Sequence, residues 1–143
     1  MPTPLRSGSA DGTVLLYRAA SHDIIQKVGD GKSGHGGAVH DVRFTAKGKA
    51  FITACADALV RIWQIGTGNI VRVLRGHTSA VTGVCFSPLD GRLVCTVGAD
   101  CSARVWRVDN GLMLKNLGSY DVAARHSNWV RDSTLPLLHF CNI

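Results

Sequence analysis

Short apolar segments separated by turn residues recur along most of the 143-residue chain. Each segment holds five to seven residues rich in Val, Ile, Leu, Phe and Trp, and Gly, Asn, Asp and Lys stand between the segments. This spacing is typical of β-strands in an up-and-down order, and no stretch of ten or more residues has a helical period. The predicted strands are 39–44, 50–55, 59–65 and 70–74, followed by 81–86, 93–98, 102–108 and 112–117.

The predicted strand LVRIWQI is apolar on both of its faces. Because successive side chains of a strand point in opposite directions, Leu59, Trp63 and Ile65 share one face. Val60 and Ile62 share the other face. A sheet with two apolar faces has to be covered on both sides, and copies of the same sheet along the chain would provide that cover. The pattern therefore predicts an all-β fold of repeated sheets.

The two series of strands belong to an internal repeat. Gly34-His35 returns as Gly76-His77, 42 residues later, and Thr53 returns as Thr96, 43 residues later. A weaker copy, SGSADGTVLLY, begins at Ser7. In all three copies a Ser or Thr lies four residues before an Asp, and an aromatic residue lies six residues after that Asp. The three sets are Ser7, Asp11 and Tyr17, then Thr53, Asp57 and Trp63, then Thr96, Asp100 and Trp106.

In these motifs and in its period of 42–43 residues, the chain resembles the WD-repeat β-propeller family. The resemblance implies a partial β-propeller of four-stranded antiparallel blades. It divides the chain into an incomplete first blade at 1–33, WD repeats at 34–75 and 76–117, and a non-repeat tail at 118–143. For this tail both an ordered and a disordered state are considered. Since closed propellers have about four to eight blades, we expect a fragment, a truncated isoform or an incorrectly predicted gene product.

The resemblance also implies one buried set of four hydrogen-bonded side chains in each complete blade. The indole would donate to the hydroxyl, the hydroxyl to the imidazole and the imidazole to the carboxylate, as the donor and acceptor capacities of these groups allow. The two sets are His35, Thr53, Asp57 and Trp63, and His77, Thr96, Asp100 and Trp106, with Ser7, Asp11 and Tyr17 as a partial third.

A His, an Asp and a hydroxyl can also form a catalytic triad. Here the set recurs at one period with an indole as its outer member, which favours a structural role. We therefore predict a protein that is not an enzyme, with no catalytic, metal-binding or cofactor-binding residues and no small-molecule substrate.

The chain is basic, with a formal net charge of +6. A basic domain can bind nucleic acid, but the basic residues of the repeats stand singly among apolar residues. We interpret them as solvated strand faces and blade edges. They are Arg43, Lys47, Lys49, Arg61, Arg72, Arg75, Arg104 and Arg107. The glycine-rich segment 29–37 lacks the spacing of a phosphate-binding loop.

The cysteines and the hydropathy pattern favour an intracellular location. The five cysteines are odd in number and form no C-x-x-C pair, which argues against a disulfide framework and a zinc knuckle. We expect them to be small buried residues in a reducing compartment, the cytoplasm or the nucleus. No apolar run approaches the roughly 20 residues that span a bilayer, so no membrane partner is predicted.

The resemblance implies a non-catalytic scaffold that binds protein partners as a WD-repeat segment of a larger multiprotein assembly. The alternative is a basic WD-repeat subunit that contacts RNA in an RNA-processing or ribosome-assembly particle, and strong salt dependence of binding would identify it. The family places partner-facing loops at the end of the blades that carries the blade-joining loops and the Asp turns. Those candidates are Gly36, Gly37, Ala38, Ala58, Thr78, Ser79, Ala80 and Cys101.

Overall fold

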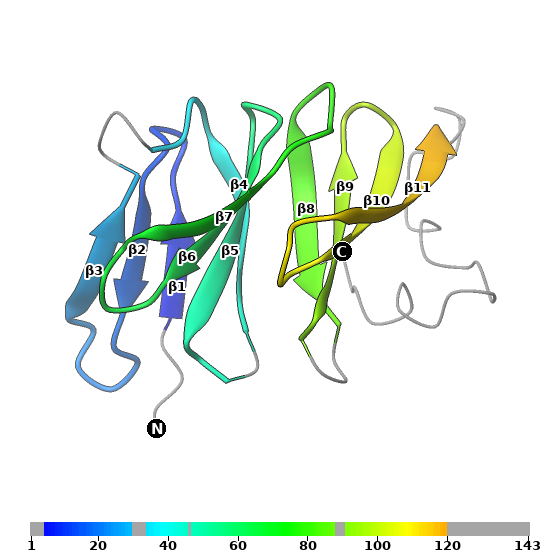
Figure 1. The fold of residues 1–143 in the computed structure, drawn as a ribbon. Helices are drawn as coiled ribbons and strands as arrows, with labels where there is room; N and C mark the ends of the chain where they lie inside the picture. Colours follow the sequence, from blue (N-terminus) through cyan, green and yellow to red (C-terminus); the bar gives the residue numbers. More distant parts are fainter. Residues whose placement is uncertain (1–4, 30–33, 46, 88–90, 120–143) are drawn as a thin grey trace.

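The computed structural model describes residues 5–29, 34–45, 47–87 and 91–119, which form three antiparallel sheets (Figure 1). The first sheet contains β1 (Leu5–Gly8), β2 (Val14–Tyr17) and β3 (Ile24–Val28). The second contains β4 (Val39–Phe44), β5 (Ala50–Cys55), β6 (Val60–Gln64) and β7 (Ile70–Leu74). The third contains β8 (Val81–Phe86), β9 (Leu93–Gly98), β10 (Ser102–Arg107) and β11 (Met113–Ser119). Within each sheet the strands are neighbours in chain order.

Most predicted strands have the predicted bounds, and the differences lie beside turns. The strand predicted at 59–65 is Val60–Gln64. Leu59 belongs to the preceding turn, because its amide donates to the Asp57 carboxylate at 3.1 Å. The last strand runs to Ser119 and so enters the predicted tail. The rest of that tail, 120–143, lies outside the described residues.

The hydrophobic core lies between the sheets, in two layers. One layer joins the first and second sheets through Val14, Leu16, Val28, Val39, Val42, Phe51 and Trp63. The other joins the second and third sheets through Ile52, Ala54, Val60, Ile62, Leu74, Val81, Val84, Val94 and Trp106. Burying one such large apolar side chain contributes about 1.5–3 kcal/mol. The second sheet is therefore covered on both faces, as its two apolar faces predict.

Equivalent side chains on β3 and β7 bind the turn of the next sheet. Gln26 on β3 accepts a hydrogen bond from the Gly66 amide at 2.9 Å. Arg72 on β7 donates to the Asp109 carbonyl. Neighbouring sheets are thus joined at their outer strands as well as through the core.

Within the described residues, no helix is long and apolar enough to cross a membrane.

Candidate functional site

In the third sheet, four polar side chains form a continuous hydrogen-bonded chain. The Trp106 indole donates to the Thr96 hydroxyl at 2.8 Å, and that hydroxyl lies 2.8 Å from Nε2 of His77. Nδ1 of His77 lies 2.9 Å from Oδ2 of Asp100. A carboxylate only accepts, so Nδ1–H donates to Asp100. Burial, which disfavours the charged form, leaves the imidazole neutral, so Nε2 accepts from the threonine hydroxyl and the proton is assigned to Nδ1.

The charges of this set follow from its surroundings. Burial lowers the pKa of His77, against the opposing effect of the hydrogen bond to Asp100. Burial alone would raise the pKa of Asp100, but hydrogen bonds from Ser102, the Thr78 amide and His77 outweigh it and lower the pKa to about 2. At neutral pH the set thus holds one ionised carboxylate and one neutral imidazole.

In the second sheet, the equivalent set divides into two parts. Trp63 donates to the Thr53 hydroxyl at 3.0 Å, and Nε2 of His35 lies 2.7 Å from the same hydroxyl. Nδ1 of His35 does not bind Asp57, so that part of the prediction is wrong. It lies instead 2.7 Å from the carbonyl oxygen of Gly12, in the turn of the first sheet. His35 therefore joins two sheets, whereas His77 binds within its own.

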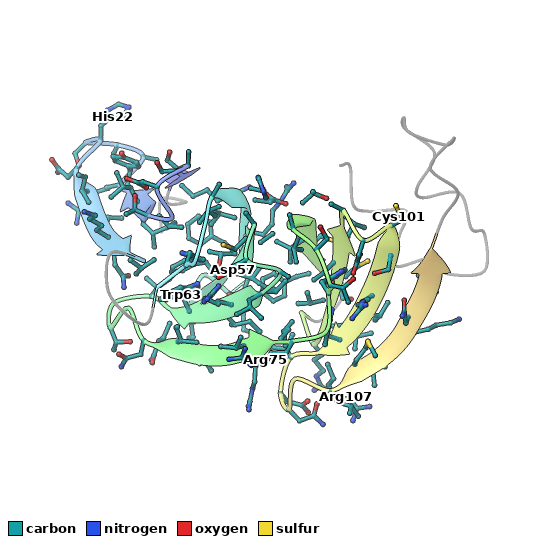
Figure 2. The ribbon with its side chains drawn as sticks, turned by 90° about the horizontal axis from the view of Figure 1, so that it is seen from above. His22, Asp57, Trp63, Arg75, Cys101 and Arg107 are labelled. Carbon is teal, nitrogen blue, oxygen red and sulfur yellow. The ribbon has the colours of Figure 1, made fainter. Side chains whose placement is uncertain are left out.

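Asp57 forms a separate ion pair with Arg61, whose Nη2 lies 2.8 Å from Oδ2. The Gly36 amide donates to the same carboxylate at 2.8 Å. Burial alone would raise the pKa of Asp57, but the hydrogen bonds from Arg61 and Gly36 hold it well below its usual range. Figure 2 shows Asp57 and Trp63 in the second sheet, beside the first.

The residue two positions after the threonine differs between the two sets. In the third sheet that residue is Gly98, and a Cβ there would lie 2.7 Å from Nδ1 of His77 and 2.9 Å from Oδ1 of Asp100. In the second sheet the equivalent residue is Cys55, whose Sγ lies 3.3 Å from the Gly37 carbonyl oxygen. The Asp57 amide lies 3.5 Å from the same sulfur, so the cysteine side chain contacts the Asp turn.

The partial set of the first sheet is not assembled. Asp11 accepts hydrogen bonds from the amide and the hydroxyl of Thr13, at 2.9 and 2.7 Å. Ser7 is exposed. Within the described residues, no hydrogen bond links Ser7, Asp11 and Tyr17. A phenol carries its donor at the end of the ring and an indole at its side, so Tyr17 cannot simply replace the tryptophan.

Two family models match the chain over most of the three sheets. The model described as the WD domain, G-beta repeat, matches residues 68–107. The model described as the anaphase-promoting complex subunit 4 WD40 domain matches residues 5–79, which is more than half of the chain. The chain belongs to the WD40 repeat β-propeller family. Its sheets are WD40 blades, and the resemblance found in the sequence is confirmed.

Relatives of this WD40 chain carry different names. It is 30% identical over 129 residues to nuclear distribution protein PAC1 of Candida dubliniensis, a match that covers 88% of this chain and 24% of the relative. It is 29% identical over 111 residues to WD repeat and SOCS box-containing protein 1 of Homo sapiens, covering 76% of this chain and 25% of the relative. The chain thus spans about a quarter of the length of these relatives.

The fold matches a solved WD40 structure. The crystal structure of the WD40 β-propeller domain of Doa1 superposes with a TM-score of 0.70 at 23% identity. The match covers 81% of this chain and 36% of that chain. The prediction of an all-β, partial propeller with antiparallel blades is confirmed.

The predicted partner-facing loops lie together at one end of each WD40 blade. The Ala56 amide donates to the Ala38 carbonyl at 2.8 Å, and the Ala99 amide donates to the Ala80 carbonyl at 2.7 Å. These bonds bring Gly36, Gly37 and Ala38 beside the Asp turn with Ala58, and Thr78, Ser79 and Ala80 beside the turn with Cys101. Figure 1 shows these turns at the upper end of the second and third sheets.

Two arginines of the WD40 blades are buried, contrary to the prediction of solvated faces. Arg61 and Arg104 are only 6% and 8% exposed. Arg104 lies 3.5 Å from Asp100, as Arg61 lies against Asp57 in its own blade. The signal was present in the sequence, because each arginine follows its Asp by four residues in both complete repeats.

The cysteines follow the prediction in part. Cys55 and Cys95 are buried free thiols, and Cys101 is a half-buried one. Burial raises the pKa of Cys95 to about 11. Within the described residues, no group of three His, Cys, Asp or Glu side chains could hold a metal ion.

Proposed function

We propose that this chain is a non-catalytic scaffold that binds protein partners through WD40 blades within a larger assembly. The observation that carries the proposal is that the side chains able to do chemistry are already hydrogen-bonded to one another. His77, Thr96 and Asp100 bind one another and the Trp106 indole, so their donors and acceptors serve the blade. The loops at the Asp-turn end carry small side chains, and Thr78 and Ser79 among them are exposed.

The relatives' names support the general role and no single assembly. One is named for nuclear distribution and another for a SOCS box beside its WD repeats. Blades of one family occur in both, and the function of each protein depends on the sites placed on its blades. We propose an intracellular protein, in the cytoplasm or the nucleus, with protein partners and no cofactor.

Crosslinking of the tagged full chain in cells, followed by mass spectrometry of the recovered proteins, tests this role. Trp63→Ala should unfold the second blade, because truncating a buried tryptophan costs about 3–5 kcal/mol, and should abolish recovery of the partners. Ser79→Arg, in an exposed loop at the Asp-turn end, should reduce recovery with an unchanged circular dichroism spectrum. Lys47→Glu, in an exposed turn at the other end, is the matched control. Unchanged recovery by an unfolded Trp63→Ala chain would overturn the proposal.

The net charge of +6 supports RNA binding as a second candidate. The buried pairs of Arg61 and Arg104 with aspartates weaken it, since these cations do not face solvent. Fluorescence polarisation with a labelled single-stranded RNA should give weak binding. If the chain contacts RNA phosphates, affinity should fall by orders of magnitude between about 50 and 200 mM salt. Tight binding that is insensitive to salt would contradict this electrostatic account.

A further inference from the structure

The outer strands β3, β7 and β11, which are the last strands of their sheets, share a β-bulge at the same place. In β7 a register shift opposite Ile62 and Trp63 leaves Val71 without an opposite residue. The equivalent shifts leave Ile25 of β3 and Leu114 of β11 without one. Val71, Ile25 and Leu114 are 53%, 45% and 43% exposed. A bulge bends an edge strand and re-aims its side chain, so this outer rim presents side chains rather than a regular strand edge.

The exposure of Val71 belongs to a blade that has neighbours on both sides. The middle blade is covered on its two faces by the other blades, and Val71 is still the most exposed of the three bulge residues. Among the described residues, the exposed large apolar side chains all lie on an outer strand or directly before one. They are Ile24, Ile25, Val71, Leu112, Met113 and Leu114. Residues 112–114 form a run of three exposed apolar side chains, which a folded surface carries only where a function requires it.

The rim is also positively charged. Arg75 follows β7 directly, Lys115 lies on β11, and the amide of Arg107 donates to the Leu112 carbonyl at 2.9 Å. All three cations are exposed, and Figure 2 shows Arg75 and Arg107 on the same side of the molecule. The outer strands contain no Asp or Glu, and Asp109 is the one acidic residue in 70–75 and 107–117. A partner that carries carboxylates therefore has the complementary charge.

The apolar and basic side chains on and beside β7 and β11 are here called the rim surface: Val71, Arg75, Arg107, Leu112, Leu114 and Lys115. We infer that the rim surface binds an acidic segment of a partner protein that also carries aliphatic side chains. The inference rests on the proposed role as an interaction scaffold and gives that role a second site, with the chemistry of its partner. Aliphatic contacts supply affinity by removing apolar surface from water, and opposite charges select the partner and speed its association.

Three synthetic peptides test the chemistry of the partner on the full chain. The first repeats Leu-Leu-Glu-Glu, which in an extended segment places leucine and glutamate on both faces. The second repeats Leu-Leu-Lys-Lys, and the third repeats Ser-Ser-Glu-Glu. Fluorescence polarisation should show that the first peptide binds more tightly than either of the others. Its affinity should fall as salt is added, since exposed charges are screened beyond about 10 Å at 0.1 M.

Variants of the chain locate the binding on the rim surface. Val71→Ser and Leu114→Ser should each weaken binding of the first peptide by roughly 2- to 10-fold, since a half-exposed side chain has only part of its apolar surface left to bury. Arg75→Glu should weaken it as well. Thr82→Ser, on the inner strand β8, and Lys47→Glu, in a turn, are the matched controls and should leave binding unchanged. All five positions are exposed, so each variant should keep the circular dichroism spectrum of the wild type.

A photoreactive residue in place of Val71 tests whether the rim surface is free in the full chain. Irradiation should link position 71 to the first peptide and not to 120–143. A crosslink to 120–143, no binding, equal affinity for the first and second peptides, or an unchanged affinity of Val71→Ser would each overturn the inference. If that happens while Ser79→Arg still reduces recovery of partners, the rim site is wrong and the proposed scaffold role stands.

Discussion

At the scale of single residues, the threonine hydroxyls link neighbouring strands of a blade. Thr96 on β9 accepts from Trp106 on β10 and donates to His77, which precedes β8. All three side chains are buried. A buried donor or acceptor that loses its partner costs about 1–3 kcal/mol. The hydroxyl therefore stabilises the blade through two bonds that water cannot replace.

Thr96→Val keeps the shape of the side chain and removes this hydroxyl. It leaves the Trp106 N–H and Nε2 of His77 unpaired, so the free energy of unfolding should fall by roughly 2–4 kcal/mol. Urea denaturation followed by tryptophan fluorescence measures the change. Thr82→Val is the matched control, because the Thr82 hydroxyl is exposed and binds only the Val97 carbonyl at 3.3 Å. Equal losses for the two variants would contradict the role assigned to Thr96.

Gly98 is a second residue that matters at this scale, because its lack of a side chain leaves room for the hydrogen bond between His77 and Asp100. Gly98→Ala would place a Cβ within 2.7 Å of His77 and 2.9 Å of Asp100, so the pair should separate and the chain should lose about 1–3 kcal/mol of stability. NMR of the His77 imidazole should show loss of the hydrogen bond to Asp100. Cys55→Ala, at the equivalent position of the second blade, should cost less because a Cβ is already accommodated there. An unperturbed His77 resonance in the Gly98→Ala chain would show that this space is not limiting.

At the scale of elements, each Asp turn contains a residue in the left-handed region. Ala58 has a φ of 65° and Cys101 a φ of 58°, and the first blade has Gly12, with a φ of 83°, at this place. An L-residue in this conformation costs roughly 1–2 kcal/mol, and glycine largely avoids that cost. The Asp turns of the two complete blades therefore place a non-glycine residue in an unfavourable backbone conformation, whereas the first blade has a glycine at that position.

Ala58→Gly and Cys101→Gly should each raise the free energy of unfolding by about 1 kcal/mol. Thermal or urea denaturation of each variant measures the gain. Ala56→Gly, in the same turn but without a positive φ, should give no gain, since glycine there only loosens the unfolded chain. A loss of stability at Ala58 equal to that at Ala56 would contradict this account.

At the scale of the whole molecule, the buried histidines and aspartates make stability depend on pH. Burial lowers the pKa of His35 and His77 in the folded chain, whereas histidines of the unfolded chain titrate near 6.5. Below that pH the unfolded chain binds more protons than the folded chain, so acidification lowers the free energy of unfolding. The pKa of Asp100, about 2, adds stability that is complete above about pH 4 and is lost as the pH falls toward 2.

The urea midpoint should therefore fall between pH 7.5 and pH 5 and fall further below pH 4. It should change little between pH 7.5 and pH 8, where these groups do not titrate. Urea unfolding curves at each pH, followed by tryptophan fluorescence, check this profile. A midpoint that stays constant or rises on acidification to pH 5 would contradict the neutral state of the two imidazoles.

Sequence reasoning predicted the strands well because turn residues bracket them in both complete repeats. The resemblance to the family implied the partners of Thr53 and Thr96, and the donor and acceptor capacities of these groups agree with it. Sequence reasoning missed the bond from His35 to the Gly12 carbonyl, since that carbonyl belongs to another blade and a backbone group leaves no mark in the sequence. It also misjudged Arg61, because a charged residue on a strand is usually solvated, although the spacing of four residues from Asp57 to Arg61 was a signal of the pair.

The bond from His35 to Gly12 has a consequence for how repeats diverge in evolution. A hydrogen bond between two side chains of different repeats requires both residues, so a mutation in either repeat can remove it. A hydrogen bond to a main-chain oxygen requires only that the neighbouring turn keep its backbone conformation. The first repeat lacks a tryptophan and has a serine in place of the threonine, yet its turn still receives the imidazole of the second. Side chains of one repeat can therefore change while its hydrogen bond to the next repeat is kept.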